Sequence, residues 1–270
     1  MVWDSRTTRG KTMNKIINCD LDKFRDAVEA IWLRGKYKSS TVSKVGVISN
    51  TAVGIIKDTR LELLNGNDKS AISVTIDIEG EPQKEYMFIF DIEKIMKYLK
   101  NLKAGSLKIS IGESNITFNM GRTSIKVPVL VEHNNMGLIS MIRGLSIKTG
   151  EPVVFGKTQL PCMLMVNGEE LANAIKFCNL VGTASFKIEY IAGQSDITIS
   201  SSNFHRTEFV DRTIALVGTP SREDLTVEFS APIGKFCVKN VMALWSGDNK
   251  PIVITGPNRK MVIAPYIRNE

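Results

Sequence analysis

The feature that most constrains the fold is a repeated pattern of helical and alternating segments along the 270-residue chain. Four segments place apolar residues three or four positions apart, which puts them on one face of an α-helix. Each is followed by stretches in which apolar and polar residues alternate, as in half-buried strands. The helical segments are DLDKFRDAVEAIWL, DIEKIMKYLKNL, GEELANAIKFCNLVG and PIGKFCVKNVMALW, which begin at Asp20, Asp91, Gly168 and Pro232.

The order strand, helix, several strands, helix, strands occurs twice along the chain. This predicts an α+β fold of two similar domains, each an antiparallel sheet with two helices on one face. We expect a disordered N-terminal arm over residues 1–13, an N-terminal domain over 14–130 and a C-terminal domain over 161–270. Residues 131–160 are too long and irregular for a tight turn, which indicates an interdomain connector that carries function.

Positive charge is in excess, with 35 Lys and Arg against 28 Asp and Glu, a net charge of +7. Basic residues recur on the polar faces of all four helical segments, so the two domains together would present a positive surface. Lysine suits sequence-independent contact with phosphate, and no aromatic platform for single strands is present, so double-stranded DNA is the expected partner. The candidate DNA-binding residues are Lys23, Arg25, Lys94, Lys97, Lys100, Lys176, Lys235 and Lys239.

Nothing in the sequence indicates catalysis or a cofactor. His133 and His205 have no nucleophile or metal-ligand spacing around them. The four cysteines are far apart and form no CxxC pair, so neither a metal site nor a disulfide framework is expected. No apolar run of 18 residues or signal peptide is present, which predicts no membrane association and a cytoplasmic protein, or a nuclear one in a eukaryote.

The C-terminal run VIAPYI contains a proline where a strand is otherwise expected. Pro265 has no N–H to donate to a ladder, so we expect strand pairing to stop there. The apolar side chains beyond it would then stay open to a partner.

Several short motifs make the sequence resemble DNA polymerase sliding clamps of the proliferating cell nuclear antigen type. EAIW in the first helical segment is similar to the Glu-Ala-Leu of that family's first helix, and EKIMKYL and NGEELANAI resemble its second and third helices. DNKPIVIT and VIAPYI are similar to its D-x-P-L-x-V-E strand and terminal L-A-P-[KR]-I. The resemblance runs from about Lys15 to Ile267.

The resemblance implies a homotrimeric ring that encircles DNA, is placed there by a clamp loader, and tethers DNA polymerase and other proteins bearing a clamp-binding peptide. Carried over by position, Arg25, Lys94, Lys97, Lys176 and Lys239 would line the channel. The peptide pocket would use Pro251, Ala264, Pro265 and Ile267, and we add Leu138 and Ile142 from the connector.

The long connector and the excess of positive charge depart from the family pattern and fit a divergent clamp of archaeal, viral or plasmid origin. Two alternatives stay open at this point. One is an open processivity factor resembling the herpesvirus type, which holds DNA as a monomer or dimer. The other is a clamp-like scaffold for DNA repair or transcription.

Overall fold

The structure is a computed structural model, and it describes residues 15–33, 50–133, 135–147, 151–181, 185–202, 207–230 and 233–266. The predicted N-terminal arm, His205 and Ile267 lie outside these residues. We call residues 15–130 the first half, residues 131–160 the connector and residues 161–266 the second half.

The first half contains two helices and a series of strands. In chain order these are β1 (Lys15–Asp20), α1 (Leu21–Ile31), β2 (Thr51–Asp58), β3 (Arg60–Gly66), β4 (Ser70–Asp77), β5 (Gln83–Asp91), α3 (Ile92–Leu99), β6 (Ser106–Ile111), β7 (Asn115–Met120) and β8 (Thr123–Pro128). The connector holds α4 (Met136–Gly144), β9 (Val153–Phe155) and β10 (Thr158–Leu160).

The second half repeats the same order of strands, and two short 3₁₀ turns stand among its helical elements. Its elements are β11 (Cys162–Asn167), α5 (Gly168–Cys178), η1 (Asn179–Val181), β12 (Phe186–Tyr190), β13 (Asp196–Ser202), β14 (Phe209–Ala215), β15 (Leu225–Phe229), η2 (Ile233–Lys235), β16 (Val241–Ser246), β17 (Ile252–Gly256) and β18 (Arg259–Ile263). The element η2 is a short 3₁₀ turn at the place where the first half has α3.

The two halves also pair their strands in the same way. The first half has the orders β1-β6-β7-β8 and β5-β2-β3-β4, and the second has β11-β16-β17-β18 and β15-β12-β13-β14. All of these pairings are antiparallel. The halves are joined because β18 pairs with β4, which makes one eight-stranded sheet that runs from β11 to β5.

Three of the predicted helices, α1, α3 and α5, form where the sequence predicted them, because each has a cap and an apolar face. Asp20, Asp91 and Asn167 precede α1, α3 and α5, and their side chains accept hydrogen bonds from backbone N–H groups of the first turn. In α1 the apolar residues Phe24 and Val28 are buried against the sheets. The predicted α+β fold is therefore confirmed.

The fourth predicted helix is wrong in its extent. Among the described residues of this segment only Ile233–Lys235 is helical, and Val241–Ser246 forms a strand. The sequence IGKFC at Ile233 matches IEKIM at Ile92. However, Ser106 starts the next strand 14 positions after Ile92, whereas Val241 does so only 8 positions after Ile233. The shorter segment leaves no room for further helical turns before β16.

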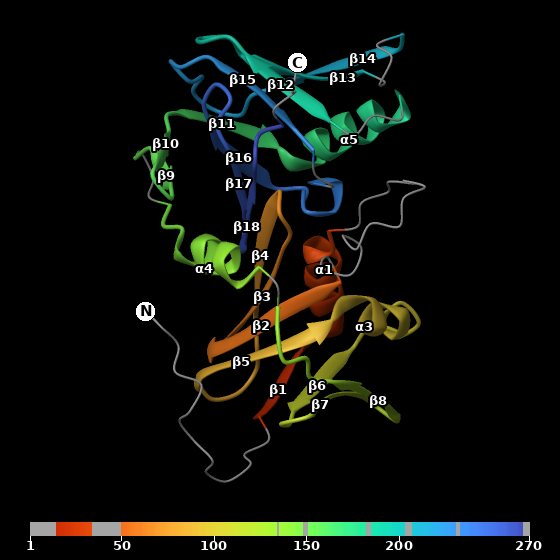
Figure 1. Cartoon of the computed structure of the whole chain (residues 1–270). Coiled ribbons are helices and arrows are strands. Elements are labelled where there is room, and N and C mark those ends of the chain that lie inside the picture. The colour runs from red at the N-terminus through yellow and green to blue at the C-terminus, as the bar shows by residue number, and fades with distance from the viewer. Residues whose placement is uncertain are drawn as a thin grey trace.

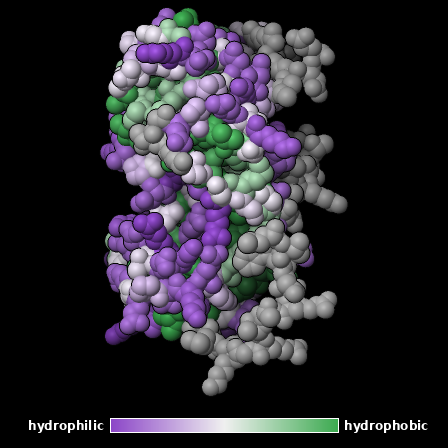
Figure 2. All heavy atoms as spheres, turned by 90° about the vertical axis from the view of Figure 1, so that its left-hand side faces the viewer, coloured by the Kyte–Doolittle hydropathy of each residue, from purple (hydrophilic) through white to green (hydrophobic). Residues whose placement is uncertain are grey.

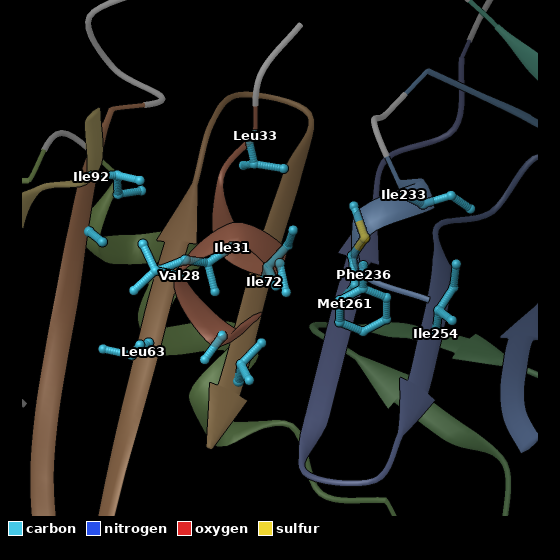
Figure 3. Close-up of a cluster of buried hydrophobic side chains, with 14 of the residues drawn as sticks. Val28, Ile31, Leu33, Leu63, Ile72, Ile92, Ile233, Phe236, Ile254 and Met261 are labelled. Atoms are coloured by element: carbon cyan, nitrogen blue, oxygen red, sulfur yellow. The ribbon is translucent and has the colours of Figure 1, made fainter. Parts of the chain in front are cut away.

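Two apolar layers cover the faces of the eight-stranded sheet. Figure 1 shows α1, α3 and α5 on one side of the molecule, and α4 with the β9–β10 hairpin on the other. We call these the helix face and the connector face. Neighbouring residues of β18 alternate between them, because Met261 packs into the core of the helix face and Val262 into that of the connector face. Figure 3 shows the core where the halves meet, with Val28 and Ile72 from the first half and Phe236 from the second.

Candidate nucleic-acid interface and partner surface

The predicted lysines lie on elements of the helix face. They come from α1, from α3 and the residue after it, from α5, and from η2 with the segment after it. Figure 1 shows α1, α3 and α5 on one side of the chain. The exposed ones are Lys23, Lys94, Lys97, Lys100, Lys176, Lys235 and Lys239. The sequence pattern thus located a set of solvated cations that the fold gathers on one side.

Three of these lysines contact a carboxylate or an aromatic ring. Lys94 Nζ lies 3.8 Å from a carboxylate oxygen of Asp91, and Lys100 Nζ lies 5.8 Å from the ring centre of Trp32. Lys235 Nζ lies 3.2 Å from a carboxylate oxygen of Glu29. Exposed pairs of this kind contribute little stability, so the lysines stay available to a stronger anion.

Arg25 differs from the lysines because its guanidinium is already used within the protein. Its Nε and Nη2 atoms donate to the carbonyl oxygens of Leu99 and Leu102 at distances of 3.1 and 2.7 Å. Nη1 donates to Asp22 at 2.9 Å. Arg25 therefore ties α1 to the C-terminal end of α3, where it satisfies carbonyls left open by the helix.

A pair of ionic contacts joins the two halves on the helix face, and the sequence analysis missed it. Arg259 Nη2 donates to Asp26 Oδ2 at 2.8 Å, and Nη1 donates to the Phe236 carbonyl at 3.0 Å. The Arg259 side chain is only 9% exposed. Lys235 and Glu29 form the second contact from the second half to α1. No local sequence signal connects residues 233 positions apart.

On the connector face, α4 lies across the junction of the halves. Ile142 is fully buried under it and Leu138 is partly buried, and both pack into the core of the connector face. Lys260 of β18 donates to the carbonyls of Arg143 and Leu145 at 3.1 and 3.4 Å, which caps the end of α4. Burial lowers the pKa of Lys260. Ile142 thus supports α4 from beneath rather than lining the surface.

The first half holds α4 from below through a second set of polar contacts. Arg143 lies 3.0 Å from an oxygen of Glu85 and 3.4 Å from one of Glu62. The hydrogen bond from Arg143 lowers the pKa of Glu85, and the same bond raises the pKa of Arg143. At the other end of the helix, Asn135 Nδ2 donates to the Gly66 carbonyl at 3.1 Å. The connector is therefore an ordered layer where the structure describes it.

The C-terminal segment changes partner at Pro265. The N–H of Ala264 donates to the Lys69 carbonyl, and the N–H of Tyr266 donates to the Glu228 carbonyl, both at 2.7 Å. The backbone thus passes from the edge of β4 to β15, and Pro265 lies between these bonds where no donor is needed. The expectation that backbone pairing stops at Pro265 is therefore wrong, because the N–H of Tyr266 still donates to a backbone carbonyl.

The predicted pocket residues that the structure describes are partly brought together. Ile252 pairs with Ile263, so Pro251 lies beside Ala264 at the end of the β17–β18 hairpin. Ala264 is exposed and Pro265 partly buried, and alternation puts Ala264 on the face of Val262, the connector face. Figure 2 shows that face, where hydrophobic patches appear between hydrophilic side chains, most of them in its upper half.

Burial shifts the pKa of several titratable side chains in the described residues. Burial raises the pKa of Cys19 and Cys237 to about 12, so these thiols are neutral near pH 7. Burial also lowers the pKa of His133, which contacts the Thr51 carbonyl at 3.2 Å. Within the ranges described above, no group of three or more His, Cys, Asp or Glu side chains could hold a metal ion. No helix in those ranges is long and apolar enough to cross a membrane.

Comparison with known proteins identifies the fold. No protein-family model and no curated protein matches the sequence. The structure is similar to the DNA polymerase sliding clamp from Bacillus subtilis, with a TM-score of 0.71 and 14% identity over 98% of this chain and 67% of that chain. It is also similar to the DNA polymerase III beta subunit of Thermotoga maritima, with a TM-score of 0.68 and 13% identity. That match covers 97% of this chain and 68% of the other.

A third similar structure is that of A. fulgidus PCNA with the C-terminal region of FEN-1 bound. Its TM-score is 0.67 at 14% identity, and the match covers 96% of this chain and 100% of that one. The chain therefore has the sliding-clamp fold, as its motifs suggested. Its sequence is strongly divergent from all three structures.

The contact between Arg143 and Glu85 predicts a pH dependence. The pKa of Glu85 is lowered from its ordinary value of 4.5, so the contact stabilises the fold above that pH and the stabilisation is lost as the pH falls through the folded pKa. We expect Arg143→Met to lower stability by about 1 kcal/mol at pH 7 and to matter less near pH 3. Thermal unfolding of both proteins between pH 3 and 7 measures this difference.

Arg122→Met is the matched control, because Arg122 is exposed in the β7–β8 turn. Its unfolding curve should follow the wild type at every pH. A constant difference between wild type and Arg143→Met over the whole range would contradict an ionic origin for the effect.

Proposed function

We propose that this protein is a DNA sliding clamp, a non-enzymatic processivity factor that closes head to tail into a homotrimeric ring around duplex DNA. It would tether DNA polymerase and other proteins that carry a clamp-binding peptide, and a clamp loader would open it. Such a protein works where the DNA is, in the cytoplasm or in a eukaryotic nucleus. The observation that carries the proposal is that the two strands paired between the halves each have an equivalent end strand, β8 and β14, in the two remaining sheets.

This equivalence follows from the strand orders. Within the chain, β18 at the end of one four-stranded set pairs with β4 at the end of another. The equivalent end strands are β8 in the first half and β14 in the second, and each is the last strand of its sheet. Pairing β8 of one copy with β14 of the next repeats the internal contact. A head-to-tail contact of this kind closes into a ring when its rotation allows.

The register of this contact can be derived from the internal one. The β7–β8 and β17–β18 hairpins both close with two-residue turns, so Thr123 corresponds to Arg259 and Lys126 to Val262. The pairs Leu61 with Ile76 and Ile197 with Ile214 align β4 on β14, which makes Phe209 the counterpart of Ala71. Since Val262 pairs with Ala71, we expect Lys126 of one copy to pair with Phe209 of the next.

The surface at the β14 end supports an interface. Phe209 is 65% exposed, and Phe177 and Leu180 at the end of α5 are 44% and 73% exposed. Exposed apolar side chains along an unpaired strand edge favour association with another chain. In the ring that results, the helix faces would point inward, and their lysines would meet the DNA backbone without reading its sequence.

The strand pairing can be tested by cross-linking. Lys126→Cys combined with Phe209→Cys places two thiols on opposed positions of an antiparallel pair, a separation that a disulfide can span. On oxidation we expect a circular covalent trimer of three times 29.9 kDa, seen by mass spectrometry and denaturing electrophoresis. The control is Lys108→Cys with Phe209→Cys, because Lys108 lies on β6, which is already paired on both sides.

A strictly monomeric protein at micromolar concentration, with no cross-linked product, would rule out the ring. That result would favour the open processivity factor, which the basic composition also favours. A ring that forms but recruits no polymerase would favour the repair or transcription scaffold.

The lysines of α3 predict a salt-dependent DNA affinity. Replacing Lys94 and Lys97 together by Glu should weaken binding equally on every duplex sequence, because lysine contacts phosphate and not base edges. The slope of log affinity against log salt should fall by about 0.9 for each phosphate that the variant no longer neutralises. Fluorescence anisotropy with two unrelated duplexes over 50–300 mM NaCl measures both effects.

A control variant carries the same charge change on other surfaces. Lys108 and Lys157 are exposed on β6 and in the β9–β10 turn, away from the helix face. Replacing both by Glu should leave the slope nearly unchanged. Equal slopes for the two double variants would mean that the helix face is not where DNA binds.

The second expected surface is the partner-peptide pocket. Pro251, Ala264 and Pro265 would form its described part together with Leu138 of α4, and Ile267 is proposed to extend it. Ala264→Arg puts a long charged side chain into this apolar patch, so a peptide with an aromatic anchor should bind at least about 2 kcal/mol more weakly. Titration of a fluorescent clamp-binding peptide gives the affinity, with Ser140→Arg on the exposed side of α4 as the control.

Both arginine variants should keep the melting temperature and the ring size of the wild type. Ala264 is exposed, and its hydrogen bond is made by the backbone N–H and not by the side chain. Undiminished peptide binding by Ala264→Arg would place the pocket elsewhere on the connector face.

A further inference from the structure

The contact between the halves and its proposed counterpart between subunits carry different charges. Inside the chain, two ion pairs bridge the junction on the helix face: Arg259 with Asp26 at 2.8 Å, and Lys235 with Glu29 at 3.2 Å. All four charges cancel there. Because the two halves repeat the same order of elements, the residues at the equivalent positions of the junction between subunits can be identified from this structure.

The helix positions correspond through their caps. Asp26 and Glu29 lie six and nine positions after the cap Asp20 of α1, and Asn173 and Lys176 lie six and nine positions after the cap Asn167 of α5. The buried residues Phe24 and Leu171 also correspond in this alignment. An acidic pair on α1 is thus replaced on α5 by an amide and a lysine.

The opposite side of the junction corresponds through the motif and the hairpin. IEKIM and IGKFC align Lys94 with Lys235, and each lysine is the third residue of its helical element. Thr123 corresponds to Arg259, since each directly follows the turn of its hairpin. Across a subunit junction, Lys94 would therefore face Lys176, and Thr123 would face Asn173.

We propose that each subunit junction is a composite binding site for DNA phosphate, made by Lys94 of one subunit and Lys176 of the next, and that DNA thereby stabilises the closed ring. This inference rests on the ring proposed above. Two ammonium groups at the place where the internal junction has an ion pair repel each other, and a phosphate between them removes the repulsion. Lys97, one turn further along α3 and exposed, adds to the same positive surface.

The acidic residues near Lys94 and Lys176 do not neutralise the two lysines. Asp91 lies 3.8 Å from Lys94, but it is also the cap of α3 and accepts the backbone N–H of Lys94. The Glu93 carboxylate accepts a hydrogen bond from Asn50 at 3.0 Å. On α5, Glu169 and Glu170 lie in the first turn, whereas Lys176 lies in the last. The ion pairs of the internal junction hold the two halves together without DNA. The junction between subunits, in contrast, would depend on DNA phosphate for its stability.

A charge-reversal cycle tests the facing of the two lysines. Lys176→Glu recreates between subunits the Glu29–Lys235 pair that exists within the chain. We expect it to tighten ring assembly without DNA about two- to fivefold per junction, hence about tenfold or more for the ring. Adding Lys94→Glu puts two carboxylates together, so the double variant should assemble as weakly as the wild type or more weakly. Lys108→Glu is the matched control and should change nothing.

Sedimentation velocity against protein concentration at 50 mM NaCl, with and without a 30-base-pair duplex, measures the assembly. For the wild type, the duplex should lower the concentration at half assembly at least tenfold. For Lys176→Glu the duplex should have a much smaller effect, and for the double variant it should have none. Raising the salt without DNA should favour the wild-type ring, because salt screens the repulsion.

The outcomes separate this inference from the proposed function. A wild-type ring that forms equally with and without duplex, and that Lys176→Glu leaves unchanged, would overturn the composite site while the clamp proposal stands. A wild type that forms no ring at any concentration, with or without DNA, would overturn both. Tighter assembly of the single variant that disappears in the double variant would establish that the two lysines face each other.

Discussion

The pairing of β18 with β4 is the contact on which the rest of the structure depends. Five residue pairs, from Arg259 with Val74 to Ile263 with Ser70, join strands that are distant in sequence. Because successive residues of β18 point to opposite faces, this one ladder extends both apolar layers across the junction. It puts α1 and α5 on the same side of the sheet and leaves the other side for α4.

Charged side chains secure this junction from both faces. On the helix face the guanidinium of Arg259 is nearly buried and reaches a carboxylate of α1, while its Nε has no hydrogen-bond partner within the described structure. A buried cation of this kind is tolerated because its other nitrogens are satisfied, and it favours one relative position of the halves. On the connector face Lys260 caps α4, so neighbouring residues of one strand hold opposite layers in place.

The same strand geometry relates the fold to its proposed function. The two four-stranded sheets end in β8 and β14, and these two end strands correspond to β18 and β4, which are already paired within the chain. A chain built this way is suited to head-to-tail assembly. The internal and external junctions nevertheless differ in charge, so stable association within the chain does not imply equally stable association between chains.

Local chemistry in the sequence determined most of the elements. Caps such as Asp20 and Asn167 and the spacing of apolar residues specify α1 and α5, because these signals act within one or two turns. The alternation of apolar residues specified strands on either side of each helix, and the repeat of the whole pattern indicated two similar halves. Basic residues on the polar helix faces followed from the same periodicity.

The tertiary structure decided what spacing alone could not. The apolar residues of VMALWS fit a helix or a strand, and only the short distance between η2 and β16 selects the strand. Arg25 and Lys94 look alike as cations on a helix, yet the neighbouring carbonyls at the end of α3 occupy only Arg25. The contact of Arg259 with Asp26 joins residues 233 positions apart, and it exists because β18 pairs with β4. Such contacts depend on which strands meet, whereas periodicity reports only which face of an element is buried.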